Sequence, residues 1–490
     1  MIYPGSEFDQ TAAALLAPPD YVNPRPRSGY HLVVIGAGPA GLIAAIGAAG
    51  LGASVALIES GRMGGDCLNV GCVPSKALLN YVGSLQQPDF DGAFSFARQI
   101  RSEIAPHDSV CRYTELGVDV FLGEAQFQSR NSVTVAGAEI CGRRLLIATG
   151  ARPVLPSIPG LDAARPLTND TLFDLTEQPR VIGILGAGVI GCEMAQVFAQ
   201  LGTQVHLFEM ADEILPLEDP GAGAVVRKAL LDKGVHIHLG CAVEEIIAQD
   251  DRHRVRTAAA QIAVDRLLVA LGRRPNTDAL QLAKAGVEVD ARGFIVTNHR
   301  LRASNKRIFA AGDCASRAQF THNADAQARV VVQNALFAPT ASINAHVVPH
   351  SVYTDPEVSA VGQSEAELRA AHVAFDTYKV AFSELDRGRV QGDATGFAKV
   401  LTVKGSDQIL GACMVGKDAG EQLAGICLLM SNKLGLSAVG KTILAYPTRS
   451  EILKRLADAY NRTRMTPMVA RLFALWLSLI DPAKHGETRQ

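Results

Sequence analysis

The chain of 490 residues lacks several features that mark whole classes of protein. It has no surplus of basic residues, because 47 lysines and arginines face 49 acids and leave a net charge of −2. Nucleic acids and anionic membranes favour basic partners, so the composition indicates neither. No uninterrupted apolar run reaches the ~18–20 residues that span a bilayer. The stretch 42–58 comes closest, and its glycines indicate a buried helix followed by a strand.

The cysteines and the N-terminal residues argue against a secreted disulfide scaffold. The nine cysteines are scattered singly apart from one close pair, which is not the pattern of a disulfide framework. The first thirty residues have neither the basic start nor the apolar core of a signal peptide. We therefore expect a cytoplasmic protein of about three domains. Its 48% apolar residues and 45 glycines fit an α/β architecture.

A nucleotide-binding pattern follows the N-terminal arm. An apolar run predicts a buried parallel strand, and it leads into Gly36-x-Gly38-x-x-Gly41, an alanine-rich helix and a second strand that ends at Glu59. The glycines permit a tight turn and the close approach of a pyrophosphate to the helix N-terminus, while the acid receives a ribose hydroxyl. This context favours a dinucleotide site over a plain glycine-rich turn.

The same pattern recurs later in the chain. A strand leads into Gly186-x-Gly188-x-x-Gly191 and a helix, and the next strand ends at Glu209. Two fingerprints imply two dinucleotides, and the natural pairing is FAD with a nicotinamide nucleotide. Because Glu209 would repel a 2′-phosphate, NADH is favoured, although an arginine from elsewhere could admit NADPH.

The close cysteine pair lies directly after the first nucleotide unit. Residues 64–76 read Gly-Gly-Asp-Cys-Leu-Asn-Val-Gly-Cys-Val-Pro-Ser-Lys and set Cys67 and Cys72 five positions apart. Five residues of ideal helix rise about 7.5 Å, beyond the roughly 4.4–6.8 Å between the Cα atoms of a disulfide. Gly71 and Pro74 supply the irregularity that bonding requires. A bridge that closes so short a loop adds little stability, so the spacing favours a redox role.

Taken alone, the pair has two other interpretations. Free cysteines are commonly buried as small apolar residues. A zinc site is the second interpretation, but no further Cys/His pair at ligand spacing stands nearby.

Further strand ends carry small or acidic residues. The strand 145–150 ends in Ala-Thr-Gly, and an analogous strand ends at Gly272. A third strand ends at Asp313, which either binds a polyol hydroxyl or caps a helix. From about residue 346, strands at 379–382 and 397–403 are followed by helices, which predicts an α+β domain.

These motifs together resemble the flavoprotein pyridine-nucleotide disulfide oxidoreductases, the family of glutathione reductase, dihydrolipoamide dehydrogenase and mercuric reductase. The similarity covers roughly residues 30–465 and includes Tyr-Thr-Asp-Pro-Glu-Val at 353–358. It looks most like the mercuric-reductase branch. It implies an α/β fold with two Rossmann-type domains, for FAD and NAD, and a C-terminal α+β dimerisation domain in a homodimer. The expected divisions are a Pro-rich arm (1–29), the FAD domain (30–165), the NAD domain (166–285), a second part of the FAD domain (286–345), the dimerisation domain (346–465) and an apolar tail (466–490).

The resemblance also implies roles for individual residues. Cys67 would be the interchange thiol that meets the substrate, and Cys72 the charge-transfer thiol beside the flavin. Lys76 would lie near the flavin with Glu193 as its ion-pair partner. The residues expected to contact FAD are Gly36, Gly38, Gly41, Glu59, Gly65, Thr149, Gly150, Gly312, Asp313 and His322, and those expected to contact NAD are Gly186, Gly188, Gly191, Glu209 and Gly272. Without the resemblance, Lys76 would be interpreted as a solvated helix charge and His322 as a core histidine.

The sequence departs from the family's disulfide reductases near the C-terminus. Glutathione reductase and dihydrolipoamide dehydrogenase carry a catalytic histidine, supplied by the opposite subunit and oriented by a glutamate five residues later. The corresponding positions here are Tyr446 and Glu451. A phenol, with a pKa of about 10, is a poor base at neutral pH. Tyrosine at this place is similar to mercuric reductase, although an aromatic packed at a dimer interface is equally consistent.

We therefore expect an FAD-dependent, NADH-preferring oxidoreductase that uses the Cys67/Cys72 couple to reduce a thiol-bound metal ion, Hg(II) first, or a small disulfide. Soft thiolates are ligands for Hg(II) and Cu, but the C-terminal cysteine pair of mercuric reductases is absent, since the last cysteine is Cys427. No structural metal is expected. The alternatives are a dihydrolipoamide-dehydrogenase-like reductase and, from another class, a redox-sensing flavoprotein binding subunit. The tail 471–480 is apolar around most of a helix, which predicts burial against the body rather than membrane association.

Overall fold

The computed structural model describes residues 5–249 and 252–481, so parts of the predicted arm (1–4) and tail (482–490) lie outside the described residues. The chain divides into two compact units. The first comprises Met1–Leu217 and Arg227–His346, and the second comprises Glu218–Val226 and Val347–Gln490.

A seven-stranded sheet organises the first half of unit one. Its order is β3-β2-β1-β6-β5-β4, with β16 also paired to β6. The strands are β1 (Tyr30–Ile35), β2 (Val55–Glu59), β3 (Val118–Leu122), β4 (Gln126–Phe127), β5 (Ser132–Val135), β6 (Ala138–Ile147) and β16 (Ile308–Ala310). Along β1, Leu32 and Val34 enter one core and Val33 and Ile35 the other. This parallel strand, buried on both faces over 32–35, is apolar there, as the sequence predicted, and its His31 is exposed.

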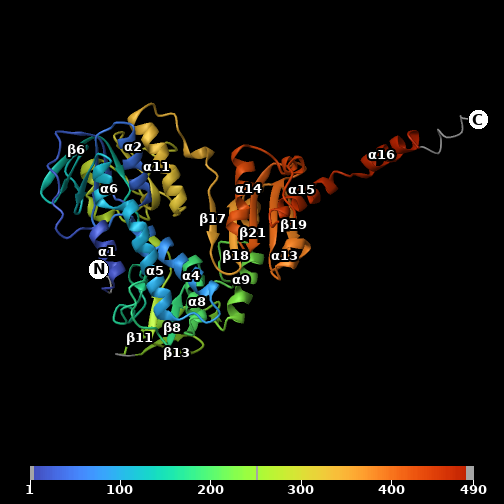
Figure 1. Ribbon diagram of the computed structural model, residues 1–490, viewed down its shortest axis with the longest axis horizontal. Coiled ribbons are helices and arrows are strands. Elements are labelled where there is room, and N and C mark those ends of the chain that lie inside the picture. Colours follow the sequence, from blue (N-terminus) through green and yellow to red (C-terminus); the bar gives the residue numbers. More distant parts are fainter. Residues whose placement is uncertain (1–4, 250–251, 482–490) are drawn as a thin grey trace, which may run out of the picture. The chain divides into compact units, whose positions relative to one another are not determined.

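Helices cover this sheet and carry the cysteine motif. They are α1 (Glu7–Leu16), α2 (Pro39–Gly50), α3 (Gly65–Val70), α4 (Cys72–Ser84), α5 (Phe90–Ile104), α6 (Val110–Glu115), α7 (Asn169–Leu172), α10 (Leu282–Ala285) and α11 (Thr321–Leu336). Figure 1 shows α2 and α11 side by side against the sheet, and both contribute to one core. Helix α1 was not predicted within the arm, although Ser6 caps it and an Ala/Leu run follows.

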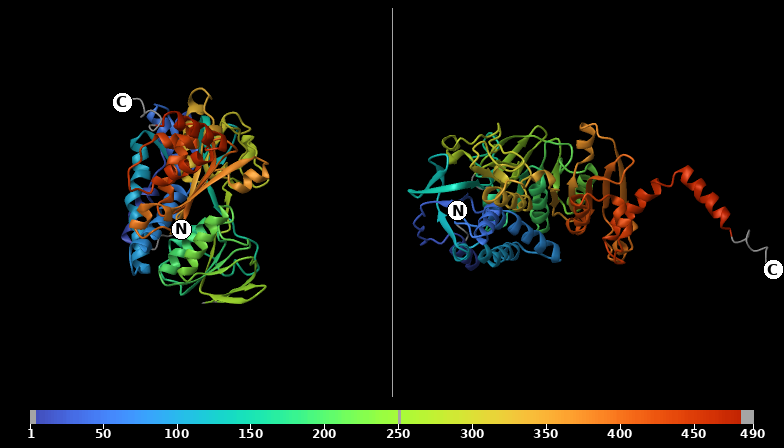
Figure 2. Two further views of the ribbon diagram at one scale, coloured as in Figure 1. Left: turned by 90° about the vertical axis from the view of Figure 1, so that its right-hand side faces the viewer. Right: turned by 90° about the horizontal axis from the view of Figure 1, so that it is seen from above.

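A second, four-stranded parallel sheet organises the other half of unit one, in the order β10-β9-β8-β14. Its elements are β8 (Val181–Leu185), α8 (Val189–Gln200), β9 (Gln204–Phe208), β10 (His236–His238) and β14 (Arg266–Val269). Helix α9 (Pro220–Asp232) begins in the segment Glu218–Val226 of unit two and ends in unit one. An antiparallel sheet accompanies the four-stranded sheet, formed by β11 (Val243–Ile247), β12 (His253–Thr257) and β13 (Gln261–Val264), and is yellow-green in the left panel of Figure 2. Strands β7 (Ala151–Pro153) and β15 (Arg273–Pro275) pair with each other.

Unit two is built on a five-stranded antiparallel sheet in the order β17-β18-β21-β20-β19. Its elements are β17 (Pro349–Val352), β18 (Glu357–Gly362), α12 (Glu365–Ala370), β19 (Phe375–Ala381), α13 (Asp386–Val390), β20 (Phe397–Val403), β21 (Ile409–Gly416), α14 (Ala419–Ser431) and α15 (Glu451–Thr463). Side chains of α14 and α15 share a core with the sheet. The fold class is therefore the predicted one, two α/β nucleotide-binding halves and an α+β domain.

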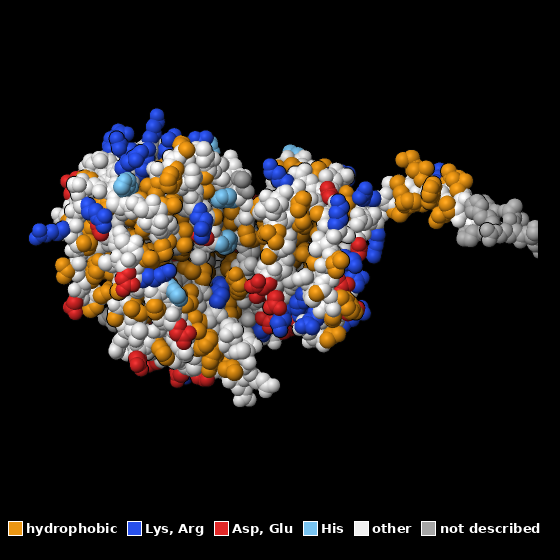
Figure 3. Space-filling view, turned by 45° about the horizontal axis from the view of Figure 1, so that its top comes forward, with side chains coloured by type: hydrophobic (Ala, Val, Ile, Leu, Met, Phe, Trp, Pro, Cys, Tyr) orange, Lys and Arg blue, Asp and Glu red, His pale blue; other side chains and the backbone are white. Residues whose placement is uncertain are grey.

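The C-terminal helix α16 (Pro467–Leu479) overturns one prediction. None of its residues is buried, so the expected packing of the tail against the body is wrong. Thr466 caps a new helix whose first residue is Pro467, and this start separates the tail from α15 and its core. Figure 3 shows hydrophobic side chains gathered over this helix. Within the part of the chain that the structure describes, no helix combines the length and apolarity needed to cross a membrane.

Candidate active site

The cysteine motif is a broken helix. Helix α3 holds Cys67 and ends before Gly71, whose φ of −136° and ψ of −120° interrupt the backbone, and α4 begins at Cys72. A Cβ at Gly71 would lie 2.8 Å from the carbonyl oxygen of Asp66, so the break needs glycine. The predicted irregularity at Gly71 is confirmed. Both cysteines are free thiols.

The two thiols have different acidities. A hydrogen bond from Cys67 is the largest cause that lowers the pKa of Cys72, to about 6, against the desolvation that raises it. The positive charge of Lys76 lowers that pKa further. The same thiol pairing and burial raise the pKa of Cys67. Since the thiolate is the nucleophile and the metal ligand, Cys72 is the sulfur that carries charge near neutral pH.

A partly buried ion pair lies one helical turn beyond Cys72. Lys76 Nζ on α4 lies 2.8 Å and 3.0 Å from the two carboxylate oxygens of Glu193 on α8. Glu193 is only 1% exposed, so removal of the lysine would take the ion pair from a buried charge. The predicted pairing of Lys76 with Glu193 is confirmed, across 117 positions of sequence.

Thr321 was missed by the sequence analysis. Its Oγ1 lies 3.6 Å from the Sγ of Cys72 and lowers the pKa of that thiol. Thr321 is the first residue of α11, whose N-terminus has no side-chain cap and favours a negative charge nearby. Its neighbour His322 stacks on Phe320 at a ring distance of 5.5 Å. The only available signal was adjacency to His322.

Both glycine turns take the conformation that the fingerprint requires. Gly36 and Gly186 have φ values of +103° and +101°. A Cβ at Gly41 would collide with the carbonyl oxygen of Gly36, and one at Gly191 would collide with that of Gly186. Any side chain here would push the helix away from its strand, so the glycines are needed for packing as well as for the turn.

The turns also leave groups that suit a dinucleotide. Gly38 and Gly188 are the N-caps of α2 and α8, and neither helix start has a side-chain cap. Such helix N-termini bind pyrophosphate. The carboxylates of Glu59 and Glu209 each accept a hydrogen bond from the backbone N–H after the first glycine of their own turn, at 2.6 Å and 2.8 Å. The residues present therefore fit two dinucleotides, one at each turn, and the assignment of FAD to the first turn stays a prediction.

Strand ends carry further residues that were predicted to contact FAD, together with Gly272, which was predicted to contact NAD. Thr149 Oγ1 donates to the carbonyl oxygen of Asn276 at 2.7 Å, and the N–H of Asn276 donates to that of Gly150 at 3.0 Å. Gly272 precedes β15, and Gly312 has a φ of +75° and donates to Gln327 on α11 at 2.8 Å. Gly65 has a φ of +58°, and a Cβ at this position would lie 2.6 Å from the Cα of Gly38. The backbone of the cysteine motif therefore packs directly on the first turn.

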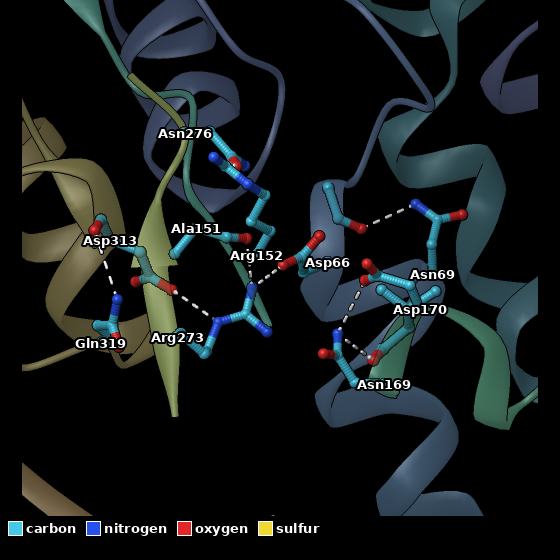
Figure 4. Close-up of polar contacts among 12 residues, drawn as sticks. Asp66, Asn69, Ala151, Arg152, Asn169, Asp170, Arg273, Asn276, Asp313 and Gln319 are labelled. Atoms are coloured by element: carbon cyan, nitrogen blue, oxygen red, sulfur yellow. Dashed lines mark hydrogen bonds and ion pairs between the residues drawn. The ribbon is translucent and has the colours of Figure 1, made fainter. Parts of the chain in front are cut away.

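One arginine holds a cluster of acids, shown in Figure 4. Arg273 contacts Asp66 and lies 3.9 Å from Asp313, and it donates to the carbonyl oxygen of Ala151 at 2.6 Å. Burial raises the pKa of Asp313 to about 6, although Arg273 lowers it. The helix-cap interpretation of Asp313 is wrong, because it lies inside the 3-10 helix Gly312–Cys314, whose N-cap residue is Ala311. Asp313 thus remains available for a polyol hydroxyl.

Tyr446 and Glu451 do not form a pair in unit two. Tyr446 donates to Asp386 at 2.9 Å, and that contact raises the pKa of its phenol. Glu451 instead binds Arg455, one helical turn away, at 2.9 Å. The arrangement differs from a histidine oriented by a glutamate, and a phenol with a raised pKa stays protonated at neutral pH.

Comparisons with known proteins agree with this geometry. Residues 30–328 match the family model described as pyridine nucleotide-disulphide oxidoreductase, and residues 348–457 match its dimerisation domain. A mercuric reductase of Lysinibacillus sphaericus is 32% identical over 88% of this chain and 83% of its own length. A dihydrolipoyl dehydrogenase of Thermus scotoductus is 35% identical over 88% and 98%.

A solved structure of the same fold is also similar. It is the Cu(II) complex of the HOCl-induced flavoprotein disulfide reductase RclA from Escherichia coli, with a TM-score of 0.81 and 33% identity over 87% of this chain and 99% of that one. Members of the matched family are FAD-dependent enzymes that take electrons from NAD(P)H. This chain belongs to the pyridine nucleotide-disulphide oxidoreductase family.

Proposed function

We propose that the protein is an NADH-dependent reductase of a thiol-bound soft metal ion, with Hg(II) as the first candidate. One observation carries the proposal: Cys72, a thiol with a lowered pKa, is paired with Cys67. In addition, the chain has Tyr446 at the position where a disulfide reductase needs a base. Two adjacent sulfurs bind soft metals tightly.

The electrons balance for this reaction. NADH and one proton reduce the Cys67–Cys72 disulfide to two thiols and release NAD⁺. The two thiols then return two electrons to Hg(II), which leaves as Hg(0) while the disulfide re-forms and two protons are released. FAD, when bound, supplies the relay between the nicotinamide and the cysteine pair.

The chain's own residues have defined parts in this scheme. Cys67 meets the metal as the interchange thiol, and Cys72 holds the charge that Lys76 and Thr321 stabilise. Glu193 fixes Lys76 in place. Tyr446, if supplied by the second subunit of a homodimer, offers a hydroxyl to the metal-bound sulfur without acting as a base. The match to the dimerisation domain supports that homodimer.

The relatives support a metal substrate without choosing among metals. Mercuric reductases are among the similar proteins, and the RclA structure is described as a Cu(II) complex. Cu(II) is therefore the second candidate acceptor. Dihydrolipoyl dehydrogenases are equally similar, so a disulfide substrate is the main competing function.

An acceptor screen with FAD-loaded protein tests the proposal. NADH oxidation is measured with Hg(II)–thiol complexes, Cu(II), lipoamide and oxidised glutathione, in wild type and in Tyr446→His. We expect turnover with the metals, little with the disulfides, and a gain of disulfide activity in the variant. Efficient wild-type turnover of lipoamide would overturn the proposal. Binding of a partner that switches with cysteine oxidation, with no turnover, would favour a sensor instead.

A further inference from the structure

Helix α16 exposes an unusual amount of apolar surface. Seven of its large apolar side chains are between 53% and 71% exposed: Met468, Leu472, Phe473, Leu475, Trp476, Leu477 and Leu479. None of its residues joins a hydrophobic core of the described chain. A contiguous apolar surface of this kind marks an interaction site.

The arrangement of these side chains suits a flat apolar surface. At 100° per residue, the large apolar positions cover roughly 200° of the helix circumference. Arg471 lies on the opposite side, and the helix contains no acid. Pairing with a single helix needs only a narrow stripe, whereas half-immersion of a helix in a lipid interface uses about half of its circumference.

The charges near α16 indicate which kind of surface it binds. Between Asp458 and Asp481 the chain has three arginines, Arg462, Arg464 and Arg471, and no acid. The whole chain has a net charge of −2, so this positive segment is local. Basic residues beside an apolar helix attract anionic lipids.

The family match does not extend over this helix. The dimerisation-domain match ends at residue 457, ten positions before α16 begins at Pro467. The helix is also too short to cross a bilayer, since 13 residues of α-helix rise about 20 Å.

We propose that α16 is an interfacial anchor that lies in the plane of an anionic lipid bilayer. Its apolar face enters the boundary between headgroups and acyl chains, and Arg471, with Arg462 and Arg464 before the helix, contacts the lipid phosphates. This inference is independent of the substrate, because it concerns only a helix outside the catalytic units of the family.

The sole tryptophan of the chain makes the test specific. Trp476 is the only tryptophan in 490 residues, so intrinsic tryptophan emission reports on α16 alone. Full-length FAD-loaded protein is mixed with vesicles of phosphatidylglycerol and phosphatidylcholine, or of phosphatidylcholine alone. We expect a blue shift of the emission, quenching by brominated acyl chains, and flotation with the anionic vesicles.

Variants separate lipid binding from a second protein copy. Leu472→Glu should abolish flotation, and Arg471→Glu should weaken it at least about fivefold, because each basic residue near an anionic surface contributes about that factor. Leu217→Glu, at a leucine that is 92% exposed outside α16, is the matched control and should bind as wild type does. NADH oxidation should be equal in all of them.

Two results would overturn the proposal. The first is wild-type emission that is already blue-shifted without vesicles and does not change when they are added, together with Leu472→Glu protein that sediments as a smaller species than wild type. These two observations would mean that a second copy of the chain covers α16. The second is wild-type protein that does not float with either kind of vesicle and whose tryptophan emission remains that of a solvent-exposed indole.

Discussion

The two glycine turns of this protein have the same backbone but different surroundings. In both, a glycine caps the helix, and an acid at the next strand end binds the turn's own backbone. A Cβ at Gly38 would lie 3.8 Å from the Cα of Gly65, whereas a Cβ at Gly188 would meet nothing within 4 Å. The cysteine motif therefore covers the first turn at Gly38, while the position of Gly188 has open space beside it. Leu215 donates to the carbonyl oxygen of Ala187 in the second turn, as Gly64 does to that of Ala37 in the first.

The acid of the first turn lies in enclosed surroundings. Burial raises the pKa of Glu59 against the hydrogen bonds from Ala37 and Gly61, which lower it. An enclosed turn suits a resident cofactor such as FAD, and an open turn suits a nucleotide that must leave after each turnover. One sequence fingerprint thus serves two kinds of binding, and the neighbouring segments decide which.

The largest expected effect comes from a change at Gly65, where the cysteine motif packs on the first turn. In Gly65→Ala, a methyl group would lie 2.6 Å from the Cα of Gly38 at a φ of +58°, so the cysteine motif cannot close on the first turn. We expect loss of bound FAD, measured by the flavin absorbance of the purified protein. Gly188→Ala is the matched change in the open turn and should keep its FAD, while the KM for NADH rises because the methyl group lies where the pyrophosphate approaches the helix N-terminus. Normal flavin content in Gly65→Ala would contradict the difference.

A smaller effect sharpens the comparison at the second acid. Glu209→Ala should raise the KM for NADH about tenfold to a hundredfold, because it removes a hydrogen bond to a charged group. It should also reduce the ratio of kcat/KM for NADH to kcat/KM for NADPH. The measurement is kcat/KM with both nucleotides, and FAD content should stay the same. Glu213→Ala, an acid paired with Arg227 at 3.1 Å, serves as the control. Unchanged discrimination in Glu209→Ala would argue that NADH preference lies elsewhere.

The smallest effect concerns the thiolate beside the covered turn. Cys72 has a pKa lowered to about 6, so its thiolate should be present above that pH and lost as the pH falls below it. Thr321→Val removes one hydrogen bond to the thiolate and should raise that pKa by roughly 0.4–1 unit, while Thr321→Ser should restore it. Two measurements give the shift of this pKa. The first is the pH profile of alkylation by iodoacetamide in Cys67→Ser protein without FAD, and the second is the pH profile of the long-wavelength charge-transfer absorption in the holoenzyme. An identical profile in Thr321→Val would remove Thr321 from the site.

Much of the fold and part of the site could be predicted because they rest on short-range rules. The strand 397–403 was predicted with the bounds of β20, and the glycine turns were predicted from spacing alone. The bounds of β19 were missed, since its first residues, Phe375–Tyr378, pair with Leu401–Val403 and their neighbours across a hairpin that has no local signature. Asp66 and Arg273 were also missed, because their contact joins segments 207 positions apart.

The sequence by itself determined which residues could form turns, strands and a reactive cysteine pair, because glycine freedom, apolar runs and thiol chemistry are local properties. Only the tertiary structure decided that Thr321, 249 positions away, reaches Cys72, that one glycine turn is covered and the other open, and that α16 is left exposed. The physical reason is that burial and through-space charge depend on neighbours brought together by packing, and sequence distance does not encode those neighbours.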